Sequence, residues 1–526
     1  MTHDHMGSAL GPTLTDEEKG RTSHHEHRAV HGVPEGLPAY DEKQRQAEVL
    51  HEVGEVAAVG EVATDAYGFD PQAEKRLVRK LDLFTVPTVA LLYLFTFIDR
   101  TNIGNARLAN FETDLHLKGV DYNAILSVFY VSYILFEIPS NIMCKIVGPG
   151  RWLPLMTFGF GIISLCTAFI TNYSSACGVR FLLGIFEAGL LPGISYYFTR
   201  WYRKSELAFR ISLYICTSPL GGAFSGLLAS GILKIDHIGS LHSWRNLFLV
   251  EGIITIGLGI ISFFTLTDRP ETARWLNPEE KALAVARIKS ENVGTKTVLD
   301  KIDKRKLILG IFNPNTVVCA WIFLLDNITA QSMAFFLPTI VSTIYPNNSV
   351  VSKQLHAVPP FVVGAAVVVI SNFFAWKLNK RLVVMMILAP LPIVGYIMFL
   401  ASEDPHVRYG ATFIIAAGSF PFGALCPSQS AANTLSDSAR SAGIGLVMVA
   451  GNIGGLIATW AFPNIGNGLN LATNALLFLS CVLLYFWLKW DNRRRDRVDM
   501  DEALADVAHI APEDLDYKHP AFRWRY

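Results

Sequence analysis

The stretch "LLYLFTFIDRTNIGNARLAN", Leu91 to Asn110, begins like a membrane-spanning helix and ends among charged side chains. No charged residue occurs from Leu83 to Ile98, and then Asp99 and Arg100 follow side by side. An ionisable side chain inside a bilayer costs at least about 2.5 kcal/mol unless it is paired or faces water. The stretch therefore predicts an apolar helix whose far end carries either a functional site or an ion pair at the membrane surface.

The composition of the whole chain indicates a membrane protein. Of its 526 residues, 51% are hydrophobic and 17% are charged, with a mean hydropathy of +0.33. Soluble domains carry about 25% charged residues. The formal net charge is zero, so charge gives no indication of a nucleic-acid partner. We expect a lipid bilayer as the surroundings and no nucleic acid.

Residue types typical of metal sites and enzymes form no convincing pattern. The seven cysteines are odd in number, show no CxxC spacing and lie mostly in apolar runs, so we expect no disulfide framework. A histidine-rich segment near the N-terminus could bind a metal, but we expect a solvated tail (His24, His25, His27, His31). No nucleophile–base pair or phosphate-binding glycine loop stands out. The sequence therefore predicts no enzyme, no metal and no cofactor.

Twelve apolar runs are long enough to span a bilayer, which takes about 20 helical residues. They lie near residues 82–106, 122–147, 153–171, 177–198, 209–233, 247–267, 316–345, 357–376, 382–401, 409–433, 442–462 and 471–490.

A polar segment divides the twelve runs into six and six, which predicts an all-α membrane protein of two six-helix bundles. The expected parts are a disordered N-terminal tail, the first bundle, a central loop with an amphipathic helix, the second bundle and a C-terminal tail (1–75, 76–267, 268–310, 311–490 and 491–526). No apolar run follows Met1, so we expect no cleaved signal peptide.

The distribution of lysine and arginine predicts the orientation in the membrane. Alternate loops are richer in these residues and are expected to face the cytoplasm, together with both tails and the central loop. The glycosylation sequons at Asn172 and Asn347 would then lie outside the cell. A third sequon, at Asn327, falls within a span and is expected to stay unmodified.

Charged residues inside the first six spans suggest a site. Arg180 and Glu187 are seven residues apart, about two helical turns, so they share a helix face with Gly184 between them. By depth, Arg180 lies near Asp99 and Arg100, whereas Glu187 lies deeper. This set suits an anion site linked to a proton-carrying group, and Glu187 is the better proton carrier because it is more deeply buried. A fixed ion network that locks two helices together is the alternative.

The last six spans carry amides in place of most charges. Asp326 is the exception, and the amides are candidates to orient a ligand (Asn327, Gln331, Gln429, Asn433 and Asn452). Gln429 and Asn433 are four residues apart and share a face. Hydrogen bonds between helices are the competing explanation for each amide. Two further acids, Glu137 and Glu251, are interpreted as structural.

Several long motifs resemble one family. The chain carries "FIDRTNIGNARL", "FEIPSN", "GPGRWLP", "RFLLGIFEAGLLPG", "WRNLFLVEG" and "FFLPTI" in register over about residues 75 to 495. With its twelve spans, it resembles the anion:cation symporter branch of the major facilitator superfamily. It is most similar to fungal permeases for allantoate, nicotinate, pantothenate and related carboxylates.

The resemblance implies roles for individual residues. Arg100 and Arg180 would bind the substrate carboxylate, Glu187 and Asp99 would carry protons, and Asn452 would lie at the substrate. The chain departs from fungal relatives at Gln331, which stands where they carry an aromatic residue before "FLPTI". It also lacks the tryptophan usual before its Asn433-bearing stretch.

Together these observations predict a monomeric secondary transporter in the plasma membrane, with protons and a small-molecule anion as its partners. Proton-coupled import of a vitamin-like or nitrogen-source carboxylate by alternating access is the favoured function. Export of a secondary metabolite by proton antiport, and a transporter-like nutrient sensor, are the alternatives.

Overall fold

The computed structural model describes residues 69–235, 237–291, 304–499, 504, 507, 510 and 512–526. Apart from Pro71, the first residue of the first helix, all the elements described below lie in the compact unit Gln72–Tyr526. The histidine-rich segment and nearly all of the predicted N-terminal tail lie outside the described residues, as do residues 292–303 of the central loop.

The first half of the fold is helical apart from one short hairpin. Its elements are α2 (Pro71–Leu108), α3 (Phe111–Asp114), α4 (Asp121–Val147), α5 (Pro149–Thr167), α6 (Tyr173–Glu187), α7 (Leu190–Thr199), α8 (Lys204–Ile215), α9 (Thr217–Ile232), β1 (His237–Ile238), β2 (Leu241–His242) and α10 (Trp244–Thr265).

The second half is entirely helical in the described residues, and short helices precede and follow it. The elements are η2 (Pro270–Thr272), α11 (Pro278–Glu291), α12 (Lys304–Ile311), α13 (Pro314–Ile344), α14 (Val350–Leu378), α15 (Arg381–Leu388), α16 (Pro390–Ala401), α17 (Pro405–Ser419), α18 (Phe422–Ala432), α19 (Asp437–Arg495), α21 (Pro512–Leu515) and η3 (Asp516–Lys518).

The structure confirms the predicted all-α membrane fold. Eleven segments in the described part of the chain are long and apolar enough to cross a membrane. The twelfth is α5, a 19-residue helix in the place predicted for the third span. It packs against α6 and α10 in the first half.

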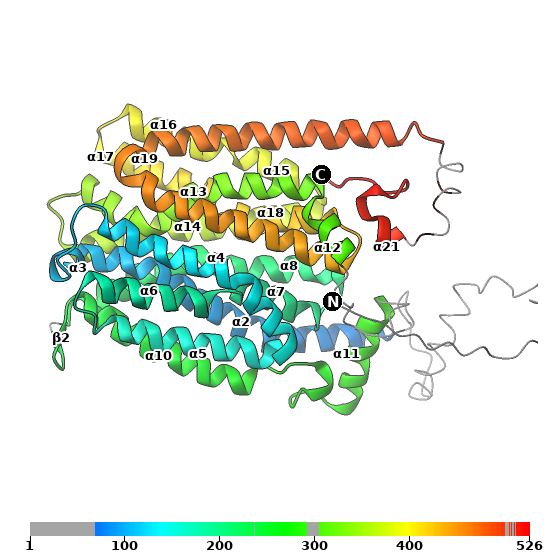
Figure 1. The fold of residues 1–526 in the computed structure, drawn as a ribbon, viewed down its shortest axis with the longest axis horizontal. Helices are drawn as coiled ribbons and strands as arrows, with labels where there is room; N and C mark the ends of the chain where they lie inside the picture. The colour runs from blue at the N-terminus through cyan, green and yellow to red at the C-terminus, as the bar shows by residue number, and fades with distance from the viewer. Residues whose placement is uncertain are drawn as a thin grey trace, which may run out of the picture. The chain divides into compact units, whose positions relative to one another are not determined.

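The last two spans belong to one 59-residue helix, α19. Its two apolar parts are Ser438–Ala461 and Gly466–Arg495, and Figure 1 shows the ribbon turning back between them. Both ends of α19 contact the same C-terminal segment, because Ser436 N donates to Asp516 while Asn492 bonds to Trp524. A straight helix of this length would hold its ends about 90 Å apart.

Several spans are broken in their middle, and one break places a charged residue. Helix α6 ends at Glu187, and Gly189 has a left-handed backbone with φ of 80° before α7 begins. A Cβ atom at this position would lie 2.5 Å from Ser140 Oγ, so the break requires glycine. Discontinuous helices in transporters occur near the middle of the membrane, where substrates bind.

The two halves meet mainly toward one end of the bundle. We call it the far end, because it is opposite to the end that carries α11, α12 and α21 (Figure 1). There Ser127 Oγ lies 2.9 Å from Thr459 Oγ1, and the Tyr122 and Phe336 rings make an edge contact. Gly104 lies directly against the carbonyl of Phe335, which leaves no room for a side chain. These contacts form a seal between the halves, here called the far-end seal.

The C-terminal segment, residues 512–526, is built into the other end of the second half. Gln429 Nε2 and Asn433 Nδ2 both donate to the Arg525 carbonyl, at 2.7 and 3.0 Å. The indole of Trp524 donates to Asp491 at 2.7 Å and packs in the hydrophobic core of this half. The segment therefore ties the end of α18 to the end of α19.

We expect Trp524→Ala to lower the thermal stability of the protein clearly. Trp524 is 3% exposed, and removing a buried tryptophan typically costs about 3–5 kcal/mol. Unfolding of purified protein can be followed with a thiol-reactive dye, because five of the cysteines are buried.

Trp490→Ala is the matched control, since Trp490 lies at the same end of α19 but is 57% exposed. Its melting temperature should stay near that of the wild type. Equal melting temperatures for the two variants would show that the docked C-terminal segment adds little to stability.

Candidate functional site

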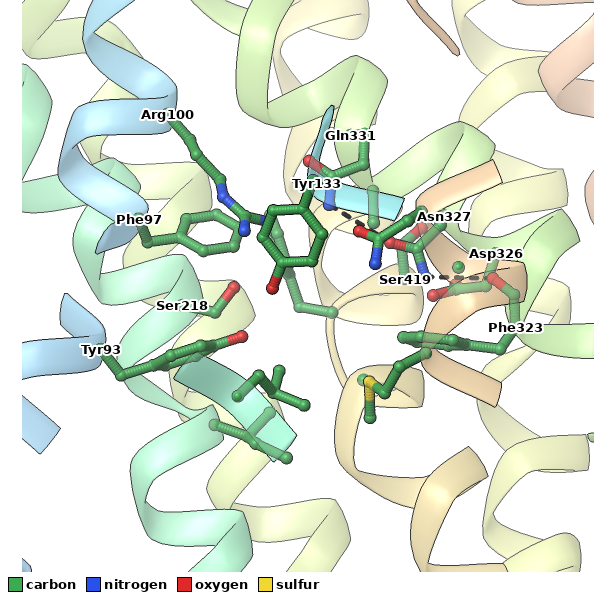
Figure 2. A pocket seen from close by; sticks show the side chains of 18 of the residues that line it. Tyr93, Phe97, Arg100, Tyr133, Ser218, Phe323, Asp326, Asn327, Gln331 and Ser419 are labelled. Carbon is green, nitrogen blue, oxygen red and sulfur yellow. Dashed lines mark hydrogen bonds between the residues drawn. The ribbon is translucent and has the colours of Figure 1, made fainter. Parts of the chain in front are cut away.

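A pocket lies between the two halves at the middle of the bundle. Helices α2, α4, α7, α8 and α9 line it from one side, and α13, α17, α18 and α19 from the other. Figure 2 shows polar and aromatic side chains from both sides pointing toward one another. The polar and aromatic side chains that line the pocket include Tyr93, Phe97, Arg100, Tyr133, Glu137, Phe323, Asp326, Asn327, Gln331, Ser419 and Asn452.

Helical periodicity explains which residues reach the pocket. On α2, Tyr93, Phe97 and Arg100 recur at three- and four-residue steps. On α13, residues 323, 326, 327, 330 and 331 follow the same rule. Residues at these spacings share one face of a helix, so a single face of each helix is turned to the pocket. The far-end seal begins about one turn beyond these residues.

Arg100 is the one cation that lines the pocket in the described part of the chain. Its Nε donates to Glu187 Oε2 at 2.7 Å, and both side chains are buried. Its guanidinium lies 5.3 Å from the centre of the Phe129 ring and 4.9 Å from that of Tyr133. The acid and the aromatic faces hold this cation at the edge of the pocket.

Glu187 lies behind Arg100 and does not line the pocket. It is the last residue of α6, and its second carboxylate oxygen, Oε1, is buried without a hydrogen-bond partner. Helix α4 approaches α6 closely beside it, because Gly184 leaves room for Ser132 and the Phe129 carbonyl. The carboxyl group is therefore shielded from water and depends on Arg100 for its charge compensation.

Asp99 and Arg180 belong to a second buried cluster, which the pocket does not reach. Asp99 Oδ1 accepts a hydrogen bond from Ser164 at 2.7 Å, and the Arg180 guanidinium lies 5.8 Å from the Phe248 ring. Arg180 lies close enough to Asp99 for their charges to interact. Glu251 lies in the same region and accepts a hydrogen bond from Asn102. The structure thus pairs Glu187 with Arg100, whereas Arg180 interacts with Asp99.

Three of the amides singled out in the sequence line the pocket, namely Asn327, Gln331 and Asn452. Gln331 Nε2 donates to Asn327 Oδ1 at 3.2 Å. Asn452 Nδ2 donates to Glu137 Oε2 at 3.1 Å, and this bond joins the two halves across the pocket. All three amides can therefore meet a ligand.

The other two amides, Gln429 and Asn433, lie outside the pocket lining. Their side-chain amides hold the backbone of Arg525, as described above. They share a helix face as their spacing predicts, but that face meets the chain's own C-terminal segment.

Some pocket residues received no role from the sequence. The sequence alone favours a structural role for Glu137 and marks Asp326 only as a rare charge within a span. Ser419 and the aromatic residues Tyr93 and Phe97 gave no signal above the apolar background. The sequence contains one signal for this pocket wall. Phe323, Asn327 and Gln331 recur every four residues, which places them on a single face of α13.

The two sequons expected outside the cell, at Asn172 and Asn347, lie on exposed loops at the far end (Figure 1). Asn347 lies between α13 and α14 and is exposed. Asn172 is also exposed, but its side chain caps α6 by accepting a hydrogen bond from Ser175 N at 2.9 Å. A glycan on Asn172 would have to leave this cap intact.

Comparisons with known proteins agree with this architecture. A model of the Major Facilitator Superfamily matches residues 89–459. The MFS-type transporter efuF of Hormonema carpetanum is 31% identical, over 92% of this chain and 99% of its own length. The high-affinity nicotinic acid transporter of Saccharomyces cerevisiae is 28% identical, over 86% of this chain and 85% of its own.

Among solved structures, the fold is similar to a bacterial homolog of the human lysosomal transporter Spinster in an inward-facing, unoccupied conformation. The TM-score is 0.54 at 15% identity, over 79% of this chain and 95% of that chain, so this likeness concerns the fold. The family match covers most of the chain and both of its halves. The chain therefore belongs to the major facilitator superfamily, as a multi-pass membrane transporter and not an enzyme.

Proposed function

We propose that the protein imports a small organic anion together with a proton by alternating access. The observation that carries this proposal is the buried ion pair of Arg100 and Glu187 at the edge of the central pocket. Arg100 can reach a ligand from the pocket, whereas Glu187 is hidden behind it. The nicotinic acid transporter among the relatives is consistent with a carboxylate substrate.

The pair links anion binding to protonation. While Glu187 is ionised, it satisfies Arg100, and an incoming carboxylate has to compete with it. A proton on Glu187 weakens this bond and leaves a buried guanidinium ready for the substrate. Charge-assisted hydrogen bonds to arginine are strong and often bidentate, so a carboxylate is the natural replacement.

The same pair also controls which states can change conformation. Breaking a buried ion pair by removing one partner costs about 3–5 kcal/mol, because a charge is left uncompensated. Arg100 is compensated in the empty carrier by Glu187 and in the loaded carrier by substrate. A carrier that holds only the proton lacks this compensation and is disfavoured, which prevents a proton leak.

The remaining candidate residues take supporting roles in this proposal. Gln331 and Asn452 orient the substrate from the second half, without charge of their own. Asp99 and Arg180 form a second buried charged cluster outside the pocket, and Asp99 acts there as a second proton carrier. Gln429 and Asn433 anchor the C-terminal segment.

Alternating access requires the far-end seal to open. In the structure the halves are joined on the far side of the pocket, at Gly104, Ser127 and Thr459. We place the far end outside the cell, because the loops at the opposite end are richer in lysine and arginine. The structure then represents a carrier closed to the outside.

Arg100→Lys should weaken substrate binding about ten-fold or more, because lysine cannot bind a carboxylate bidentately. The hydrogen bond to a charged group that is lost contributes about 1.5–3 kcal/mol. Uptake of labelled nicotinate, pantothenate, biotin and allantoate in permease-deficient yeast identifies a substrate, whose dissociation constant is then measured on purified protein. Arg180→Lys is the matched control and should bind nearly as the wild type. A loss of binding in the control alone would place the substrate at the second cluster.

Glu187→Gln should separate binding from coupling. Wild-type affinity should rise as the pH falls, because protonation of Glu187 releases Arg100. The glutamine mimics the protonated state, so the affinity of the variant should not rise as the pH falls. Exchange of internal for external substrate in vesicles should persist, whereas uphill uptake driven by a pH gradient should fail. Wild-type accumulation by this variant would exclude Glu187 as the coupling acid.

Joining the halves across the far-end seal should stop transport. The side-chain oxygens of Ser127 and Thr459 are in contact, so Ser127→Cys with Thr459→Cys brings two sulfurs within bonding reach. Copper–phenanthroline, an oxidant that enters the membrane, should form the bond in intact cells and block uptake, and a reductant should restore uptake. Each single cysteine variant should transport normally under the same treatment. Full uptake by the cross-linked protein would show that the seal is not a gate.

A further inference from the structure

The wall of the pocket opposite Arg100 contains acceptor atoms that lack partners. Asp326 Oδ1, Gln331 Oε1 and Ser419 Oγ are buried and form no hydrogen bond in the described part of the chain. Their residues are 2%, 7% and 0% exposed, and all three line the pocket. Figure 2 shows them on the side formed by α13 and α17.

Asp326 is the unusual member of this group. Other buried acids of the bundle each have a partner: Glu187 bonds to Arg100, Asp99 to Ser164, Glu137 to Asn452 and Glu251 to Asn102. Among the described residues no lysine, arginine or histidine forms an ion pair with Asp326. A buried acceptor without a partner costs free energy, so such a group indicates a ligand that completes it.

The chemistry of the three groups defines what would complete them. A carboxylate and an amide oxygen are acceptors, and a serine hydroxyl can accept as well. An ammonium group carries three donors and a positive charge, which matches one carboxylate and two neutral acceptors. A second carboxylate on the ligand would instead be repelled by Asp326.

We propose that Asp326, Gln331 and Ser419 form a subsite for a protonated nitrogen of the substrate. This inference rests on the proposed function and narrows its substrate class to zwitterions, with a carboxylate at Arg100 and a basic nitrogen at Asp326. Such a ligand compensates both charged walls at once. A plain carboxylate leaves Asp326 buried and unsatisfied.

The space between the two charged walls suits such a molecule. Aromatic side chains from both halves line it, including Tyr93, Phe97 and Tyr133 from the first and Phe323 and Phe420 from the second. Aromatic faces accept both the apolar body of a substrate and a cationic nitrogen.

Matched pairs of acids test the subsite directly. Two such pairs are meta-(aminomethyl)benzoate with meta-ethylbenzoate, and δ-aminovalerate with hexanoate. The members of each pair differ only in an ammonium group that replaces a methyl group. Dissociation constants are measured on purified wild-type protein and on Asp326→Asn, which keeps the side-chain shape and removes the charge.

The wild type should prefer the amino acid of at least one pair about ten-fold or more, as expected for a hydrogen bond to a charged group. Asp326→Asn should bring the two members close to parity and leave the plain acid bound at least as tightly. Ser419→Ala should reduce the preference by a smaller factor. Because each value is a ratio within one protein, differences in expression or folding do not affect it.

Several results would overturn the inference. One is binding of the plain acids with no preference for the amino acids. Another is a preference that survives in Asp326→Asn and disappears in Glu137→Gln, which would move the nitrogen to Glu137. A third is unchanged preference in Asp326→Asn with loss of proton-driven uptake, which would make Asp326 a coupling acid. If no acid of any kind binds, the proposed function itself fails.

Discussion

The ion pair between Arg100 and Glu187 is the constraint around which the first half of this transporter is arranged. Neither charge can remain alone in a membrane-embedded core, so α2 and α6 have to stay in register. Gly184 lets α4 approach α6, and the ring of Tyr133 on α4 then covers the guanidinium. The break at Gly189 ends α6 at the acid. Three helices and one glycine break thus serve a single contact.

The second half is built on a different principle. Its pocket wall contains amides, one serine and Asp326, and the structure pairs none of its described pocket residues in an internal ion pair. Amides held by single hydrogen bonds, such as Gln331 and Asn452, can exchange these bonds for bonds to a ligand, whereas an ion pair resists change until a proton arrives. In the scheme proposed here, the first half therefore supplies the coupling and the carboxylate site, and the second half recognises the rest of the substrate.

The sequence predicted the fold well, because membrane spans depend on local composition. The lengths of the apolar runs and the six-and-six division follow from residues that are adjacent in the chain. The same local reasoning identified Arg100 and Glu187 as important but did not pair them. Depth along a helix can be counted from the sequence, which is why Arg180 was expected beside Arg100. The direction in which each helix faces its neighbours depends on packing between helices, and single-chain spacing does not contain it.

The amides of the second half also show that spacing along the chain does not reveal what a helix face contacts. Gln429 and Asn433 share a helix face, as their spacing requires, yet both side chains donate hydrogen bonds to the backbone carbonyl of Arg525. Contacts between residues almost a hundred positions apart leave no periodic trace in the sequence. Asn327 and Gln331 have the same four-residue spacing and do line the pocket. Spacing therefore identifies which residues act together, and only the packing of the helices decides whether they meet a substrate or the protein itself.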